Sequence, residues 1–409
     1  MDILNERCAG LDIHKKTIAA CIIVPRPDGT LVKQVRTFDT MTPDLLALAD
    51  WLTSAGVTHV AMESTGVYWK APYNLLEGNF TLLLVNPQHM KAVPGRKTDV
   101  RDCEWIADLL RHGLLQASFV PDREQRELRE LTRYRTSLVR ERANEVNRVQ
   151  KTLEGANIKL ASVATDILGK SGREMLEALV AGSTDAAAMA QLAKRRMRAK
   201  IPQLERALTG RFDDHQRFLV AEQLEHIDFL DAKIAKLSAA IEERLRPFAE
   251  ELDRLDSIPG IDRRNAEVLL AELGPDMSRF PTSGHLASWA RLCPGSNESA
   301  GKRKSGKTGR GNPWLRTALV QAAQAAGRTQ TYLGAQLHRL SNRRGKNKAV
   351  IAIAHTILVI VYHVLANPAM YAELGKHYFD DREREAVKDR LVRRLKNLGF
   401  DVTLAPLAA

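Results

Sequence analysis

The sequence has 409 residues, of which 44% are hydrophobic, so the chain is long enough for two or three domains and too apolar to be disordered. Its 61 Lys and Arg residues outnumber its 49 Asp and Glu residues, and the resulting net charge of +12 favours a polyanionic partner, either a nucleic acid or an anionic membrane. The four cysteines form no Cys-x-x-Cys pair, which argues against a disulfide framework or a cysteine zinc site and predicts reduced packing residues.

Secretion and membrane insertion are not expected. The first seven residues contain acids where a signal peptide needs positive charge, so we predict a cytoplasmic protein. The most apolar segment, Ala349–Ala366, approaches the length of a membrane span, but it contains His355, Thr356 and His363 and follows a basic stretch. We interpret it as a buried helix and expect no membrane partner.

The first 121 residues alternate between strand and helix patterns. Two β-rich runs lie between Cys8 and Val24, and Pro27-Asp28-Gly29 predicts the turn of a hairpin. The following elements are a helix over Thr42–Ser54 with Thr42 as N-cap, a strand ending at Glu63, a helix over Val67–Glu77 and a strand over Phe80–Val85. This alternation predicts a mixed α/β sheet.

Four carboxylates stand out in this region. Asp12 and Glu63 lie within or at the end of predicted buried strands, where an unpaired carboxylate is costly. Asp99 and Asp102 are three residues apart on a helix predicted to start near Thr98, so they share a face and repel each other unless a cation lies between them. Four such carboxylates suit Mg²⁺ or Mn²⁺, and two ions would stabilise both the attacking and the leaving oxygen in a phosphoryl transfer.

The alternative for each acid is a helix cap or a surface ion pair. We assign that simpler role to Glu104 and Asp108 on the same predicted helix. Basic residues lie beside both acid pairs, and they would either position a phosphate backbone or form a solvated rim. They are His14, Lys15, Lys16, Arg96, Lys97 and Arg101.

The middle of the chain is predicted to be helical. Arg123–Leu153 is an amphipathic helix with a strongly charged face, and Ala186–Lys200 is a shorter one. Within Val220–Leu245, apolar residues step by 3, 4, 3 and 4, which is the seam of a coiled coil. The seam is formed by Ile227, Leu230, Ile234, Leu237 and Ile241. It would pair either with another chain or with the Arg123–Leu153 helix.

Leu255–Gly274 has the form of a helix-hairpin-helix. A tight Pro259-Gly260 turn precedes a helix whose N-terminal amides, with that of Gly260, would contact a phosphate without reading sequence. Asp262 stands where a second glycine is frequent, which weakens the phosphate interpretation. A plain helical hairpin is the alternative.

A basic, glycine-spaced segment runs from Asn297 to Arg316. It begins Asn-Glu-Ser-Ala-Gly-Lys, so Ser299 sits on flexible backbone among cations, as a nucleophile for a phosphodiester would need. We expect the phosphate contacts to come from Lys302, Arg303, Lys304, Lys307, Arg310 and Arg316. The alternative is a basic loop that only touches phosphates.

Five motifs together resemble the IS110/IS1111 family of insertion-sequence transposases. In chain order they are Leu-Asp12-Ile-His-Lys, Met-Glu63-Ser-Thr-Gly, Lys-Thr-Asp99-Val-Arg-Asp102, Ile-Pro-Gly260-Ile, and Glu-Ser299-Ala-Gly-Lys followed by Gly-Asn-Pro-Trp-Leu-Arg316. The last wording resembles the IS1111 branch most. The motifs span almost all of residues 7–366.

The resemblance implies a RuvC-like, RNase H-type N-terminal domain whose acids Asp12, Glu63, Asp99 and Asp102 bind Mg²⁺, with Mn²⁺ as a substitute. It implies a transposase domain with Ser299 as nucleophile. It also implies DNA partners, a guide noncoding RNA encoded by the element, and homodimers that pair into a tetramer on the nucleoid of a bacterium. Many relatives have glycine directly after the serine, whereas Ala300 intervenes here.

We therefore expect an α/β plus α fold. The predicted domains are a RuvC-like domain over residues 1–121, a helical coiled-coil arm over 122–250, a transposase domain over 251–366 and a charged helical tail over 367–409. The expected function is strand exchange between the ends of an insertion element and target DNA through the serine and the metal. The alternatives are a RuvC-like nuclease that hydrolyses branched DNA with water, and a DNA-binding protein without catalysis.

Overall fold

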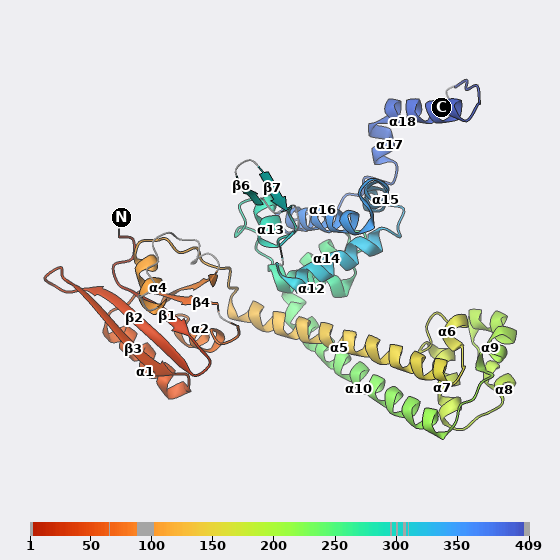
Figure 1. Cartoon of the computed structure of the whole chain (residues 1–409), viewed down its shortest axis with the longest axis horizontal. Coiled ribbons are helices and arrows are strands. Elements are labelled where there is room, and N and C mark those ends of the chain that lie inside the picture. Colours follow the sequence, from red (N-terminus) through yellow and green to blue (C-terminus); the bar gives the residue numbers. More distant parts are fainter. Residues whose placement is uncertain are drawn as a thin grey trace. The chain divides into compact units, whose positions relative to one another are not determined.

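The computed structural model of the chain describes residues 3–64, 66–87, 102–294, 297–299, 302–305, 308–309 and 311–404 (Figure 1). For residues 297–299 and 302–305 the description is of the backbone. The chain divides into two compact units, Met1–Pro121 and Asp122–Ala409, here called unit 1 and unit 2.

Unit 1 contains a five-stranded sheet. Its strands are β1 (Cys8–Ile13), β2 (Thr17–Pro25), β3 (Leu31–Asp39), β4 (His59–Glu63) and β5 (Thr81–Val85). They lie in the order β3-β2-β1-β4-β5, with β1 antiparallel to β2, β2 antiparallel to β3, and β4 parallel to both β1 and β5 (Figure 1). The predicted mixed α/β sheet is confirmed.

Helices cover both faces of this sheet. The helices α1 (Thr42–Ser54) and α2 (Lys70–Leu76) pack on the face that includes Leu11 and Met62. The helix α4 (Asp102–Arg111) packs on the opposite face, against Cys8 and Ala61. Because side chains alternate along a strand, each strand contributes to both cores.

Two local predictions in unit 1 have clear physical reasons. The β2–β3 turn forms as predicted, because the Asp28 carboxylate accepts a hydrogen bond from the Thr30 amide at 2.9 Å and Gly29 adopts a φ of +82°. The first helix begins at Thr42, but its N-cap is Met41 rather than the predicted Thr42.

Unit 2 contains two long helices, α5 (Arg123–Gly155) and α10 (Asp214–Leu245), which lie side by side (Figure 1). Leu138 of α5 packs against Leu230 and Ile234 of α10, and Arg142 forms an ion pair with Asp231. The apolar seam predicted in the second helix therefore faces the first helix of the same chain.

In the chain, α5 and α10 are separated by short helices that pack against both of them. They are α6 (Leu160–Val163), α7 (Lys170–Val180), α8 (Ala186–Ala190), the 3-10 helix η1 (Arg195–Lys200) and α9 (Ile201–Leu208). Their apolar side chains pack with Val149 and Leu153 of α5 and Val220 of α10. The predicted helix over residues 186–200 is wrong, because Arg195 has a φ of +48° that a continuous α-helix does not allow.

The remaining helices form the largest core. They are η2 (Arg246–Phe248), α11 (Ala249–Asp256), α12 (Arg263–Leu273), α13 (Ser283–Trp289), α14 (Pro313–Ala326), α15 (Tyr332–Arg344) and α16 (Lys346–Ala366). The short strands β6 (Asn297–Ser299) and β7 (Lys302–Ser305) lie between α13 and α14 in the chain. The tail carries α17 (Tyr378–Arg382) and α18 (Arg384–Asn397).

The apolar helix α16 is long and apolar enough to cross a membrane, with a hydropathy of 2.3 over its most apolar window, half of which is buried. Its residues Ile353, Ile357 and Val361 are fully buried and belong to the large core of unit 2. This packing agrees with the interpretation of the segment as a buried helix.

Candidate functional site

Asp12 and Glu63 lie at adjoining strand ends on one face of the sheet. The strands β1 and β4 are parallel, with Leu11 opposite Met62, so Asp12 and Glu63 follow at the next positions of the two strands. Leu11 and Met62 point into the core beneath α1 and α2. Because successive side chains point to opposite faces, Asp12 and Glu63 both point to the face covered by α4.

Asp102 reaches the same face because α4 lies very close to β1. A Cβ atom on Gly10 would be 2.3 Å from the carbonyl oxygen of Cys103 and 2.4 Å from the amide nitrogen of Ala107. Only glycine allows this approach of helix backbone to strand backbone. Asp102 is the first residue of α4, so the close contact holds the start of the helix beside the strand that carries Asp12.

Electrostatics around Asp12 agree with this placement. Burial raises the pKa of the Cys103 thiol, and the charges of Glu104 and then Asp12 raise it further. Nε2 of His14 lies 3.2 Å from the Asp12 carboxylate, whose side chain is 19% exposed. His14, from the predicted basic rim, thus contacts one of the predicted acids directly.

Glu104 and Asp108, which the sequence analysis assigned to helix caps or ion pairs, have partners at the surface. Glu104 forms an ion pair with Lys33 at 2.7 Å, and Asp108 lies 4.0 Å from His112 one turn further along α4. These contacts agree with a structural role for both.

The predicted metal-binding set is described only in part. Asp99 falls outside the described residues, and among those that are described no group of three His, Cys, Asp or Glu residues is close enough to hold a metal ion. Asp12 and Glu63 nevertheless lie on one face of the sheet, near the carboxyl ends of β1 and β4, and Asp102 begins the helix that covers this face. Carboxylate oxygens are the donors that Mg²⁺ and Mn²⁺ prefer, so the chemistry of the donors fits the expected cofactor.

The nearby cysteines are buried thiols. Burial raises the pKa of the Cys8 thiol to about 11 and that of the Cys21 thiol to about 12. Both thiols are therefore protonated at neutral pH. Both residues fill the space between the sheet and α4.

The segment that carries Ser299 forms a hairpin instead of an irregular loop. The strands β6 and β7 are antiparallel, with Ser299 paired with Lys302 and Glu298 paired with Arg303. Ser299 is therefore the last residue of β6, and only two residues separate it from its partner. Lys304 also belongs to β7, whereas Lys307 and Arg310 fall outside the described residues.

Arg316 forms hydrogen bonds to the backbone before and after this hairpin. Its Nη2 donates hydrogen bonds to the carbonyl oxygen of Arg291 at 2.9 Å and to that of Gly309 at 2.7 Å. Gly311 has a φ of +50°, and a Cβ there would lie 2.4 Å from the carbonyl oxygen of Ala290. The side chain predicted to contact phosphate is thus also a structural tie, and its phosphate contact stays a prediction.

A buried polar cluster holds the start of α14, which follows the hairpin. The Asn312 side chain caps α14 by accepting a hydrogen bond from the Trp314 amide at 3.0 Å, and its Nδ2 donates to the Glu272 carboxylate at 2.6 Å. Glu272 is fully buried, and Arg133 of α5 donates to both of its oxygens at 2.7 and 2.8 Å. Arg129 lies 3.6 Å away.

The cluster thus connects α5, α12 and α14, and it is not among the sequence predictions. Its signal in the sequence is an acid inside the apolar run Val-Leu-Leu-Ala-Glu272-Leu, where burial demands a cationic partner. Burial lowers the pKa of Arg129 to about 10, opposed by the charge of Glu272, so the guanidinium is still charged at neutral pH.

The segment predicted as a helix-hairpin-helix consists of α11, a turn and α12, an order that a plain helical hairpin shares. Gly260 has a φ of +93°, and a Cβ there would lie 2.3 Å from the carbonyl oxygen of Ala322 in α14. Asp262 caps α12 by accepting a hydrogen bond from the Asn265 amide at 2.8 Å. The glycine therefore serves close packing, and the carboxylate occupies a position where a phosphate would bind.

Comparisons with known proteins show which family this chain is similar to. Residues 9–158 match a transposase family profile of the IS110 DEDD type, and residues 252–339 match the family described as "Transposase IS116/IS110/IS902 family". A "Probable family 20 transposase" of Pseudomonas aeruginosa is 28% identical over 320 residues, covering 76% of this chain and 85% of its own length. The "Transposase for insertion sequence element IS1111A" of Coxiella burnetii is 26% identical over 294 residues, covering 70% of this chain and 72% of its own.

The first profile spans the sheet, α4 and all of α5, and the second spans the helices around the serine hairpin. Together with the relatives, they identify this chain as a transposase of the IS110/IS1111 family of insertion elements.

Proposed function

We propose that the protein is a DNA recombinase that exchanges strands between the ends of its insertion element and a target through a phosphoserine at Ser299. The observation that carries this proposal is the placement of Asp12, Glu63 and Asp102 on one face of the sheet at adjoining element ends. Gly10 allows this placement by letting α4 approach β1. Carboxylates on one face in this way offer the hard oxygen donors that Mg²⁺ and Mn²⁺ prefer.

In the proposed reaction, the Oγ atom of Ser299 attacks the scissile phosphorus. A bond forms between Oγ and phosphorus, and the bond from phosphorus to one strand oxygen breaks, which leaves that strand with a free hydroxyl group. The hydroxyl of another strand then attacks the phosphoserine and restores the serine. Lys302, Arg303 and Lys304 would offset the phosphate charge during both steps.

Mg²⁺ or Mn²⁺ held by Asp12, Glu63, Asp99 and Asp102 would supply Lewis-acid stabilisation of the attacking and leaving oxygens. The acids themselves contribute the negative charge and oxygen donors that such an ion needs. We therefore propose that unit 1 is a RuvC-like, RNase H-type domain.

We also propose that the protein works as an oligomer guided by RNA. In this proposal, an element-encoded noncoding RNA selects the DNA by base pairing. The arm, α5 to α10, would join dimers into a tetramer. Two aromatic side chains of α10 support a contact on the arm, because Phe218 is 63% exposed and Phe229 is 55% exposed. A cytoplasmic, nucleoid-associated location follows from this function.

The test is a search for a covalent complex between the protein and DNA. Labelled element-end DNA is incubated with Mg²⁺, the associated RNA and either the wild type or Ser299→Ala, and adducts are separated under denaturing conditions. We expect a band with the wild type and with the control Ser305→Ala, and none with Ser299→Ala or in EDTA.

Other results would contradict the proposal. An adduct with Ser299→Ala would exclude this nucleophile. Free 5′-phosphate and 3′-hydroxyl ends without an adduct would indicate a nuclease that uses water. Normal recombination by Asp12→Ala and Glu63→Ala would exclude the metal site.

A further inference from the structure

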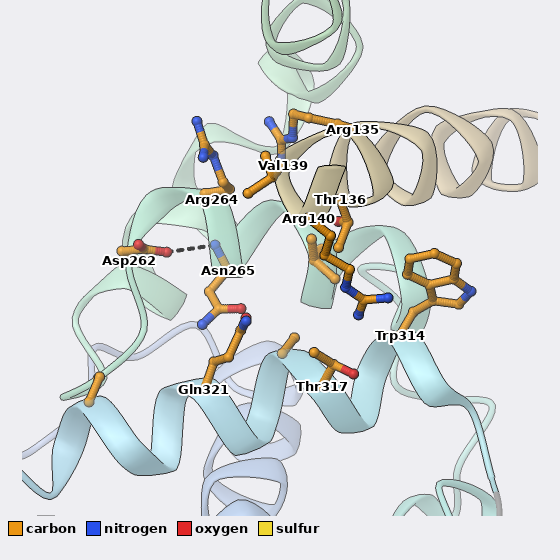
Figure 2. Close-up of a pocket in the computed structure, with 14 residues that line it drawn as sticks. Arg135, Thr136, Val139, Arg140, Asp262, Arg264, Asn265, Trp314, Thr317 and Gln321 are labelled. Atoms are coloured by element: carbon orange, nitrogen blue, oxygen red, sulfur yellow. Dashed lines mark hydrogen bonds between the residues drawn. The ribbon is translucent and has the colours of Figure 1, made fainter. Parts of the chain in front are cut away.

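A pocket of about 290 Å³ lies within unit 2, between α5, α12 and α14 (Figure 2). It shares no residue with the serine hairpin or with the acids of unit 1. Its walls include the three arginines Arg135, Arg140 and Arg264, whereas Asp262 is its one acidic lining residue among those described. The volume is near the lower end of small-ligand sites, which is about 300 Å³, so the pocket suits one small unit of a ligand.

A buried arginine in the pocket wall has unused donors. Arg135 is 2% exposed, and its Nη1 donates to the Glu267 carboxylate at 2.6 Å. Its Nε and Nη2 atoms are buried and have no hydrogen-bond partner in the described part of the chain. Buried N–H groups of a cation are costly when unpaired, so an acceptor from outside the chain would stabilise this wall.

An aromatic ring lies opposite the α12 wall. Trp314, in the first turn of α14, lines the pocket, and the guanidinium of Arg140 lies over its ring at 5.2 Å from the centroid. Figure 2 shows Arg140 extending from α5 beside Trp314. Indole rings and guanidinium planes are the groups on which proteins stack unpaired nucleobases.

Neutral groups complete the pocket. The amide side chains of Asn265 and Gln321 point toward each other from α12 and α14 (Figure 2). The Thr317 hydroxyl donates to the carbonyl oxygen of Pro313 at 2.7 Å, which leaves its oxygen available as an acceptor. Amides of this kind both donate to and accept from the edges of a base.

From these observations, we infer that the pocket binds one unstacked nucleotide of a nucleic-acid strand. Its base stacks on Trp314 and contacts Asn265 and Gln321, and its phosphate faces the arginines. This inference rests on the proposed function, because it assumes that the protein acts on nucleic acid. The same chemistry is present in single-stranded DNA and in RNA, and the experiment separates these two sources.

The test uses fluorescent single-stranded oligonucleotides of about 12 nucleotides, a length in the range that one binding site covers. One is DNA and one is RNA of the same sequence, and each contains one 5-iodopyrimidine. Binding to the full-length protein is measured in EDTA, so that no cleavage occurs. Irradiation followed by peptide mapping then locates the attached base. We expect the adduct on the peptide that contains Trp314, with whichever strand type occupies the pocket.

Three variants separate stacking from charge. Trp314→Ala removes the ring, and Ala325→Phe fills the pocket from an exposed position of α14, so neither changes the charge. We expect each to weaken binding by about 5- to 100-fold, to abolish the adduct at this site and to leave the salt dependence unchanged. Arg140→Gln is expected to lower the slope of log affinity against log salt by about 1.

The inference is overturned if both Trp314→Ala and Ala325→Phe bind within about two-fold of the wild type, or if the adducts map only elsewhere. The two proposals fail separately. Loss of the Ser299-dependent covalent complex with an intact photoadduct would refute the proposed catalysis alone. A normal covalent complex with no photoadduct at Trp314 would refute the pocket alone.

Discussion

Replacing Gly10 by alanine tests the contact that places Asp102 beside Asp12. The new Cβ would lie 2.3 Å from the Cys103 carbonyl oxygen and 2.4 Å from the Ala107 amide nitrogen, and both are backbone atoms that cannot rotate away. An ordinary contact is about 3.5 Å, so α4 must withdraw from β1 by about 1 Å. Overpacking of this kind costs about 1–3 kcal/mol.

The assay is thermal unfolding of the full chain. Because a domain of this size loses about 4 °C in Tm for each kcal/mol, we expect the transition of unit 1 to fall by about 4–12 °C. At a temperature where the variant is folded, the displaced Asp102 should also reduce formation of the covalent DNA complex.

The matched control is Gly155→Ala at the end of α5. A Cβ there meets no atom within 4 Å, and this glycine does not have a positive φ, so we expect unchanged or slightly increased stability. If Gly10→Ala unfolded within about 1 °C of the wild type, α4 would not pack on β1 at the stated distance, and the arrangement of the three acids would have to be abandoned.

Three further predictions concern other parts of the chain. Arg133→Gln should reduce the free energy of unfolding of unit 2 by about 3 kcal/mol in urea titrations, because it removes the bidentate partner of fully buried Glu272. A loss below about 1 kcal/mol would show that the polar cluster around Glu272 is not essential for stability. At pH 8 the folded protein should be alkylated by iodoacetamide at Cys293 and not at Cys21, because burial raises the pKa of the Cys21 thiol to about 12. The free energy of unfolding should fall as the pH rises above 9, because this thiol ionises at such a pH only in the unfolded chain. Rapid labelling of Cys21 in the native state would contradict its burial. Asp262→Ala should cost about 1 kcal/mol, measured by thermal unfolding, because it removes the cap of α12, and unchanged stability would show that the cap contributes nothing.

Several features of this protein could be predicted from the sequence, because they depend on periodicity and on residue type. Runs of β-forming residues predicted the strands around Asp12 and Glu63, and the 3-4 spacing from Ile227 to Ile241 predicted a helix with one apolar face. The apolar segment around Ile357 was predicted as a buried helix and is one. The motifs also predicted the family, which the comparisons confirm.

Tertiary structure decided what local patterns leave open. The seam on α10 looks the same whether it faces another chain or α5, and only the fold shows that it packs on α5. Glycine is required at position 10 because the backbone of a helix almost a hundred residues later in the chain packs against it, and no local rule detects this requirement. The partners of Glu272, Arg133 on α5 and Asn312 before α14, are likewise set by packing of distant helices. The sequence by itself thus determined which residue types are present and which elements carry them. The tertiary structure determined which of them meet, because contacts between distant segments depend on how whole helices and sheets pack together.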